Sequence, residues 1–138
     1  MTALAADLEV TERDGVVQSA PMVATDTIYR GAIVMHNAAG FLAPAATGAG
    51  SFFAGIAEEQ VTNTGSAGDK NCKYKRTGVY LLTSSGLAQA DIGTKVYASD
   101  DQTLTTTSTN NVLVGQIVEF VSATSVWVSL EHNSVISA

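Results

Sequence analysis

The residues that could carry catalysis in this chain are few and widely separated. The two histidines are His36, which precedes a loop, and His132, which lies near the C-terminal end. A Ser-His-Asp hydrolase needs a histidine held beside a nucleophile and an acid. The Gly-x-Ser-x-Gly sequence of a nucleophile elbow is also absent from the chain. We therefore predict a protein that is not an enzyme.

Two pairs of neighbouring acidic residues could suggest other chemistry. Glu58-Glu59 resembles the paired carboxylates of glycosidases, but adjacent residues of a strand point to opposite faces, so the pair is predicted to lie at a solvated strand end. Asp100-Asp101 could bind calcium, yet the alternating ligands of an EF-hand loop are missing. A tight turn is the better interpretation of this pair. We expect no metal and no cofactor.

Cys72 is the only cysteine, so the chain can form no internal disulfide and no thiolate-rich metal site of its own. Nearby lysines could lower the pKa of its thiol, but there is no second cysteine to complete a redox pair. We predict that Cys72 serves as a small buried hydrophobic residue.

The only basic cluster surrounds Tyr74 and consists of Lys70, Lys73, Lys75 and Arg76. Basic residues interleaved with an aromatic residue can bind single-stranded nucleic acid. However, the net charge of the chain is −6, which repels phosphate backbones and anionic lipids. We therefore expect no direct nucleic-acid partner and no membrane partner. The cluster either docks on an acidic protein surface or forms a solvated face, and the sequence leaves both open.

The length of 138 residues indicates one domain, and a charged fraction of 14% with only two prolines is typical of a folded, β-rich protein. No apolar run approaches the roughly 18 residues of a membrane span. Asp7 and Glu9 stand where a signal peptide needs a basic start and an unbroken apolar stretch. We expect the protein to remain in the cytoplasm where it is made.

Residues 1–24 differ from the rest of the chain, because they combine alanine-rich and acidic pieces without an aromatic residue or a sustained period. They are predicted to form an N-terminal arm. The arm is either an ordinary frayed terminus or a segment that orders against a neighbour by adding a strand to its sheet. Residues 25–138 are predicted to form a single β-rich domain.

The body consists of short β-type segments separated by turns. Phe41–Pro44 should lie at an edge or at a strand end, because proline cannot pair on both sides. Phe52–Ala57 is a candidate buried strand. A helical turn is expected over Leu87–Ile92, capped by Ser85. Trp127 lies on the polar face of its strand and is either a core residue or an interface anchor. The predicted strands are 27–35 (bent at Gly31), 52–57, 72–77, 79–82, 95–98, 103–105, 112–121 and 125–130.

This regular recurrence of strands without an amphipathic helix of normal length predicts a mainly β fold, a compact β-sandwich or small β-barrel. The order and spacing of several segments resemble the small capsid decoration, or cement, proteins of tailed bacteriophages and prophages. The resemblance covers roughly residues 27–130 and does not include the arm. It is carried by Gly55–Glu59, Gly68–Lys70, Gly78–Leu82, Ile92–Tyr97, Asp100–Thr103, Val114–Val118 and Val126–Val128.

The resemblance implies a protein that binds the outside of an expanded phage head, commonly as a homotrimer, and clamps neighbouring subunits of the major capsid protein. Its location would be the outer surface of the virion. The alternative is a receptor- or carbohydrate-binding module of a fibre or tail, which would place Tyr29, Tyr97 or Trp127 in a groove. The residues named as candidates for a capsid or subunit interface are Asp7, Glu9, Arg13, Lys73, Lys75, Tyr97 and Trp127.

Overall fold

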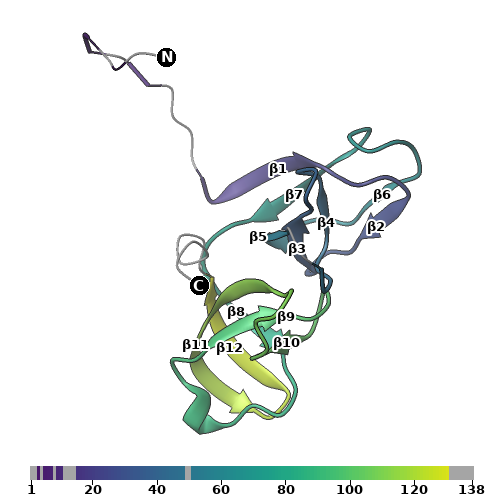
Figure 1. The fold of residues 1–138 in the computed structure, drawn as a ribbon. Coiled ribbons are helices and arrows are strands. Elements are labelled where there is room, and N and C mark those ends of the chain that lie inside the picture. Colours follow the sequence, from purple (N-terminus) through teal and green to yellow (C-terminus); the bar gives the residue numbers. More distant parts are fainter. Residues whose placement is uncertain (1–2, 4, 8, 11–14, 49–50, 131–138) are drawn as a thin grey trace.

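The computed structural model describes residues 3, 5–7, 9–10, 15–48 and 51–130. Within them the chain is built from strands and one short 3-10 helix, η1 (Gln89–Asp91), which confirms the predicted mainly β class (Figure 1). The strands are β1 (Val17–Pro21), β2 (Asp26–Ile28), β3 (Ile33–His36), β4 (Leu42–Pro44), β5 (Phe52–Ala57), β6 (Val61–Asn63), β7 (Asn71–Lys75), β8 (Val79–Thr83), β9 (Lys95–Ala98), β10 (Leu104–Thr105), β11 (Val112–Ser122) and β12 (Ser125–Leu130).

The first sheet has the order β1-β7-β5-β3-β4, and its pairs are antiparallel. Its central strands β3 and β5 are buried on both faces: Val34 and Ala54 pack on one side, and Ile33 and Phe53 on the other. Strands buried on both faces need continuous apolar runs, which is what 52–57 supplies. The predictions that 52–57 is buried and that Pro44 lies at an edge or a strand end are confirmed, because β4 is an edge strand and ends at Pro44.

β1 lies inside the segment predicted to be the arm, residues 1–24. It pairs with β7 from Val17 opposite Lys75 to Pro21 opposite Asn71, so the first sheet begins earlier in the chain than the sequence indicates. Only Ala20 of this strand is buried. A short edge strand of small and polar residues leaves little hydrophobic pattern, which is why the sequence did not reveal it.

The single bent strand predicted over 27–35 is wrong. The backbone of Gly31 has φ +88°, which turns the chain between β2 and β3. β2 then pairs with β6 in a separate small sheet, whereas β3 enters the first sheet. The segment divides into two strands because β2 and β3 pair with different strands, β6 and β5, which lie far away in the sequence.

The second sheet has the order β10-β9-β11-β12-β8 and is also antiparallel. β9 and β10 form the hairpin predicted around Asp100-Asp101. Asn110 has φ +59°, as expected of an asparagine in a turn. The helical turn within Leu87–Ile92 is present as η1, but Ala88 precedes it instead of Ser85, and the Ala88 N–H donates to Oδ2 of Asp91 at 2.8 Å.

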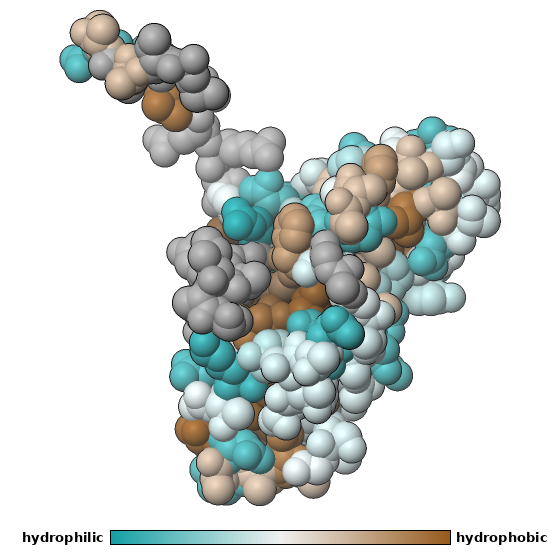
Figure 2. Space-filling view, in the orientation of Figure 1, coloured by the Kyte–Doolittle hydropathy of each residue, from teal (hydrophilic) through white to brown (hydrophobic). Residues whose placement is uncertain are grey.

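The two sheets share a hydrophobic core, and a second core lies between the first sheet and the β2-β6 pair. The shared core joins Ile33, Met35 and Phe53 of the first sheet to the inward side chains of β9, β11 and β12. Figure 2 shows apolar residues gathered between the upper and lower sheets. This packing agrees with the predicted β-sandwich. The part of the chain that the structure describes contains no helix long and apolar enough to cross a membrane.

Candidate interaction surface

The described residues before Gly15, among them Asp7 and Glu9, are exposed and belong to no strand or helix. Figure 1 places them away from the two sheets. Arg13 lies outside the described residues. The predicted interface role of these three residues stays a prediction.

Lys73 and Lys75 follow the predicted alternation on β7. Cys72 and Tyr74 point into the core, while Lys73 is exposed and Lys75 is half-buried. Lys73 lies opposite Ser19 of β1, and Lys75 lies opposite Val17. The two ammonium groups therefore belong to a polar surface at one edge of the first sheet.

β8 is the edge strand of the second sheet, and it presents apolar side chains to solvent. Val79 is 52% exposed and Leu81 is 50% exposed. Tyr80 and Leu82, which alternate with them, pack against the shared core, and the Tyr80 hydroxyl donates to the Thr77 carbonyl at 3.1 Å. An exposed apolar edge strand is an open site for pairing with another chain.

Trp127 extends this apolar surface onto β12. It lies directly opposite Leu81, and it is half-buried between the core-facing residues Val126 and Val128. Its side chain is therefore on the outer face of the sheet, on the same side as Val79 and Leu81. We call Val79, Leu81 and Trp127 the β8–β12 face.

The sequence indicates Trp127 as an interface candidate but does not single out Val79 and Leu81. The run Val79–Leu82 is apolar at every position, and such a run is equally consistent with a strand buried on both faces. Only the packing of the second sheet, which places one face of β8 on the shared core and leaves the other in solvent, exposes every second side chain.

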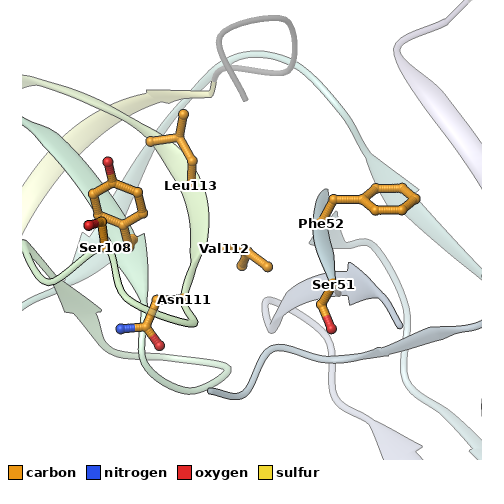
Figure 3. A pocket seen from close by; sticks show the side chains of 7 residues that line it. Ser51, Phe52, Ser108, Asn111, Val112 and Leu113 are labelled. Atoms are coloured by element: carbon orange, nitrogen blue, oxygen red, sulfur yellow. The ribbon is translucent and has the colours of Figure 1, made fainter. Parts of the chain in front are cut away.

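Tyr97 is half-buried on the outer face of the second sheet, where it lies opposite Leu113. Both residues line a cavity of about 260 Å³ between β5 and the start of β11. In Figure 3, Ser108 and Asn111 lie on one side of it and Ser51 on the other, and the Phe52 ring points away. The other lining residue is Val112.

The lining of this cavity is apolar and neutral polar, with hydroxyl and amide groups but no charged residue. Such a surface suits an uncharged side chain or a neutral ligand better than an ion. No group of three potential metal-ligating residues occurs anywhere in the described part of the chain. The cavity therefore offers apolar contacts and neutral hydrogen-bonding groups.

His36 takes part in a small aromatic cluster at the end of β3. Its Nε2 lies 3.4 Å from the Tyr74 hydroxyl, and its ring centroid lies 5.4 Å from that of Phe52. Burial lowers the pKa of His36; a hydrogen bond with the Gly40 backbone opposes this, and the charge of Arg76 lowers the pKa further. The site favours a neutral imidazole.

This shift predicts a pH-dependent stability. The unfolded chain has the ordinary histidine pKa of 6.5 and the folded chain a lower one, so the unfolded state takes up the proton first as the pH falls. The contribution of neutral His36 is therefore complete above pH 6.5 and is lost progressively below it. Urea unfolding at about pH 7.5 and pH 5 should show a larger loss of stability for the wild type than for His36→Gln. Equal losses would contradict the assignment.

Cys72 is fully buried, as predicted, and burial together with the nearby Glu59 raises the pKa of its thiol to about 11. The thiolate is the reactive form of cysteine. The lysines that flank Cys72 do not activate it, because its side chain lies on the opposite face of β7.

The structure thus brings together only some of the predicted interface residues. Lys73 and Lys75 share one strand, and Tyr97 and Trp127 share the outer face of the second sheet, although β11 separates their strands. These two groups lie on different sheets. Comparison of the chain with protein-family models, with curated protein sequences and with solved structures gives no match.

Proposed function

We propose that this protein is a phage capsid decoration protein, non-enzymatic, that binds the outer surface of an expanded head as a homotrimer and stabilises contacts between major capsid protein subunits. The observation that carries the proposal is the β8–β12 face, where Leu81 and Val79 are half-exposed beside Trp127 at an open sheet edge. A stable monomer gains nothing from exposing these side chains, whereas a binding protein does.

The chemistry of this face suits docking onto another protein. Tryptophan is among the residues that most often dominate binding energy at interfaces, because it buries a large rigid area. As the edge strand of its sheet, β8 can pair with a strand of the partner, which adds affinity without requiring particular side chains.

The charges support a protein partner over nucleic acid. The chain as a whole carries −6, and Lys73 with Lys75 forms a basic patch at the edge of the first sheet. In this proposal the basic patch meets an acidic patch of the major capsid protein, which improves specificity and the association rate.

A second candidate function is that of a receptor- or carbohydrate-binding module. The observation that favours it is the cavity beside Tyr97, whose hydroxyl and amide lining fits a neutral polar ligand. Trp127 and Tyr29 are not among the residues that line this cavity.

The test is co-sedimentation of the purified protein with expanded heads stripped of their decoration. We expect saturable binding in a fixed ratio to the major capsid protein and a higher temperature of head disruption. The Leu81→Ser/Trp127→Ser variant should bind at least about tenfold more weakly, because both substitutions remove apolar area at the centre of the face.

The matched control is Ile92→Ser, which also removes an exposed apolar side chain but lies outside β8 and β12. It should bind like the wild type. Circular dichroism and thermal unfolding establish that each variant is folded. Failure of the wild type to bind any head lattice would refute the decoration role and lead to a glycan screen. Unchanged binding by the double variant would refute only the role of the β8–β12 face.

A further inference from the structure

The two five-stranded sheets have the same topology. Taken in chain order, β1, β3, β4, β5 and β7 of the first sheet correspond to β8, β9, β10, β11 and β12 of the second. With this correspondence the first sheet, β1-β7-β5-β3-β4, and the second, β8-β12-β11-β9-β10, have an identical order of strands. All neighbouring pairs are antiparallel in both.

The agreement extends to irregular features. An isolated parallel bridge joins Met22 to Leu42 in the first sheet and Ser84 to Leu104 in the second. Gly31 and Gly93 both have φ +88°. The interval along the chain is the same from Met22 to Ser84, from Gly31 to Gly93 and from Leu42 to Leu104.

Backbone hydrogen bonds repeat in the same way. The Gly31 N–H donates to the Ala57 carbonyl at 2.9 Å, and the Gly93 N–H donates to the Ile117 carbonyl at 2.8 Å. Gly55 and Gly115 also lie at equivalent places, because each pairs with the strand that follows the turn glycine. The chain therefore contains two copies of one structural unit, repeat one (17–75) and repeat two (79–130).

The edge strand of repeat two, β8, turns alternate backbone groups away from its sheet. The Gly78 carbonyl accepts from an N–H of β12 at 3.0 Å, and the Ser84 N–H donates at 2.9 Å to the carbonyl just before β12. In an antiparallel ladder every second residue turns its backbone groups to the partner strand, and the residues between turn theirs away. The N–H and C=O groups of Val79 and Leu81, and the N–H of Thr83, therefore point to the open side of β8.

This open side is unoccupied along most of the strand. Among the described residues, β8 pairs with β12 alone, and the bridge from Ser84 to Leu104 lies beyond its end. Val79 and Leu81 thus expose both their backbone groups at the edge and their side chains on the outer face.

The edge strand of repeat one, β1, has the same alternation. The Val16 carbonyl accepts a hydrogen bond and the Met22 N–H donates one on the side of β7, each at 2.9 Å. The residues that turn their backbone away from β7 are therefore Val17, Ser19 and Pro21. The interval along the chain matches them with Val79, Leu81 and Thr83 of β8.

Repeat one carries the features that keep foreign strands off a sheet edge. Pro21 has no N–H to offer an added strand, and the exposed Ser19 offers it no apolar surface. Lys73 and Lys75 place two ammonium groups on the outer face beside β1. Proline and lysine at an edge are common protections against strand addition in natural sheets.

Repeat two lacks these protections at the equivalent positions. Thr83 stands in place of the proline and supplies an N–H, and Leu81 stands in place of the serine. Trp127 occupies the position of Lys73. Because the two repeats share one backbone arrangement, these side chains alone leave the edge of β8 open to strand addition while that of β1 is guarded.

Two carboxylates lie beside the β8 edge. Glu119 is exposed and lies opposite Trp127 on the outer face. Burial raises the pKa of Tyr80, and the charge of Glu58 raises it further, so Glu58 lies close to the inner side of β8. These carboxylates attract a cationic segment, which the lysines of β7 repel from the edge of β1.

We infer that the open edge of β8 binds an extended segment of a partner protein, which adds as a strand and carries apolar residues on one face and basic residues on the other. Its apolar face meets Val79 and Leu81, and its basic face meets Glu58, because successive residues of a strand point to opposite faces. The inference rests on the proposed function only for the identity of the partner, which makes this segment part of the major capsid protein.

The experiment is fluorescence anisotropy with a labelled peptide of alternating lysine and valine. We expect saturable binding by the wild type. Leu81→Ala removes the side chain and keeps the edge N–H, whereas Leu81→Pro removes both. Leu81→Pro should bind the peptide at least about tenfold more weakly than Leu81→Ala, because a carbonyl of the peptide then loses its donor.

The matched control is Ser19→Pro, which makes the same backbone change at the equivalent edge position of repeat one. Pro21 shows that a position of this kind accepts proline. Ser19→Pro should bind like the wild type, and circular dichroism with thermal unfolding establishes that each variant is folded. No binding by the wild type, or equal binding by Leu81→Pro and Leu81→Ala, would overturn the inference.

The charge of the segment has its own test. A peptide of alternating glutamate and valine should bind the wild type at least about tenfold more weakly than the lysine peptide, because its charges meet carboxylates. Equal affinity for the two peptides would overturn the basic character of the segment.

Other occupants of the edge would give different results. The Leu81 amide should exchange its hydrogen rapidly in the free protein and slowly with the lysine peptide bound. Slow exchange in the free protein would overturn the inference by showing that this chain covers its own edge. Self-association in sedimentation velocity that Leu81→Pro abolishes would overturn it in favour of a second copy.

Head binding separates this inference from the proposed function. Stripped heads that bind the wild type and Leu81→Pro equally would overturn strand addition at β8 and leave the decoration role standing. A wild type that binds the lysine peptide through β8 but binds no head would support the inference and refute the decoration role.

Discussion

Replacing Gly115 with alanine is expected to lower the free energy of unfolding by about 3 kcal/mol. A Cβ atom at this position would overlap the carbonyl of Ser129 on the neighbouring strand and would also lie 3.1 Å from the Val128 side chain. A backbone carbonyl cannot move aside without disturbing the pairing of β11 with β12. Since Gly55 occupies the equivalent place in the first sheet and meets the carbonyl of Lys75, Gly55→Ala should cost a similar amount.

Gly48→Ala is the matched control for these substitutions. A Cβ atom at Gly48 would meet no heavy atom within 4 Å, and this residue is not among the glycines with positive φ. Its stability should stay within about 0.5 kcal/mol of the wild type. Urea unfolding measures all three variants. Unfolding of Gly115→Ala at the same urea concentration as Gly48→Ala would show that the strands do not approach each other as described.

Phe53→Ala is expected to destabilise the protein by about 3–5 kcal/mol, the usual cost of removing a buried phenylalanine. Phe53 is 3% exposed and lies in the core that both sheets share. Its neighbour Phe52 is 50% exposed and contacts only the His36 ring among the aromatic side chains described. Phe52→Ala removes the same atoms one residue away and should cost about 0.5–1 kcal/mol.

Two probes can follow this pair of variants. Fluorescence of Trp127, the only tryptophan, reports on the second sheet, and far-ultraviolet circular dichroism reports on all strands. Because Phe53 belongs to the first sheet but packs in the shared core, both signals should shift together in Phe53→Ala. A fluorescence transition that stays at the wild-type position would mean that the two sheets unfold independently.

Local features of the sequence were sufficient to predict the fold class. Short apolar or alternating runs separated by glycine, asparagine and aspartate are typical of an all-β domain, because turn residues and strand periodicity act over only a few residues. The same local reasoning placed Pro44 at a sheet edge, Cys72 in the core and Asn110 in a turn. These features depend on the backbone conformation of one residue or on the alternation of one strand.

The sequence could not predict which strands pair, because pairing joins segments that are distant in the chain. β1 offered no hydrophobic pattern and was assigned to the arm, yet β7 holds it in the first sheet. The exposure of Val79 and Leu81 follows from the packing of only one face of β8 on the shared core, which depends on how the two sheets meet.

The sequence alone determined the β class, the turns, the buried cysteine and the acidic, cysteine-poor character of this protein. The tertiary structure alone decided that the chain contains two copies of one unit. Backbone hydrogen bonds maintain that unit and tolerate most side chains, so few identical pairs remain, among them Gly31 with Gly93 and Leu42 with Leu104. The outer faces of the two sheets have different surroundings, so their side chains differ, and Lys73 and Trp127 occupy equivalent positions with different chemistry.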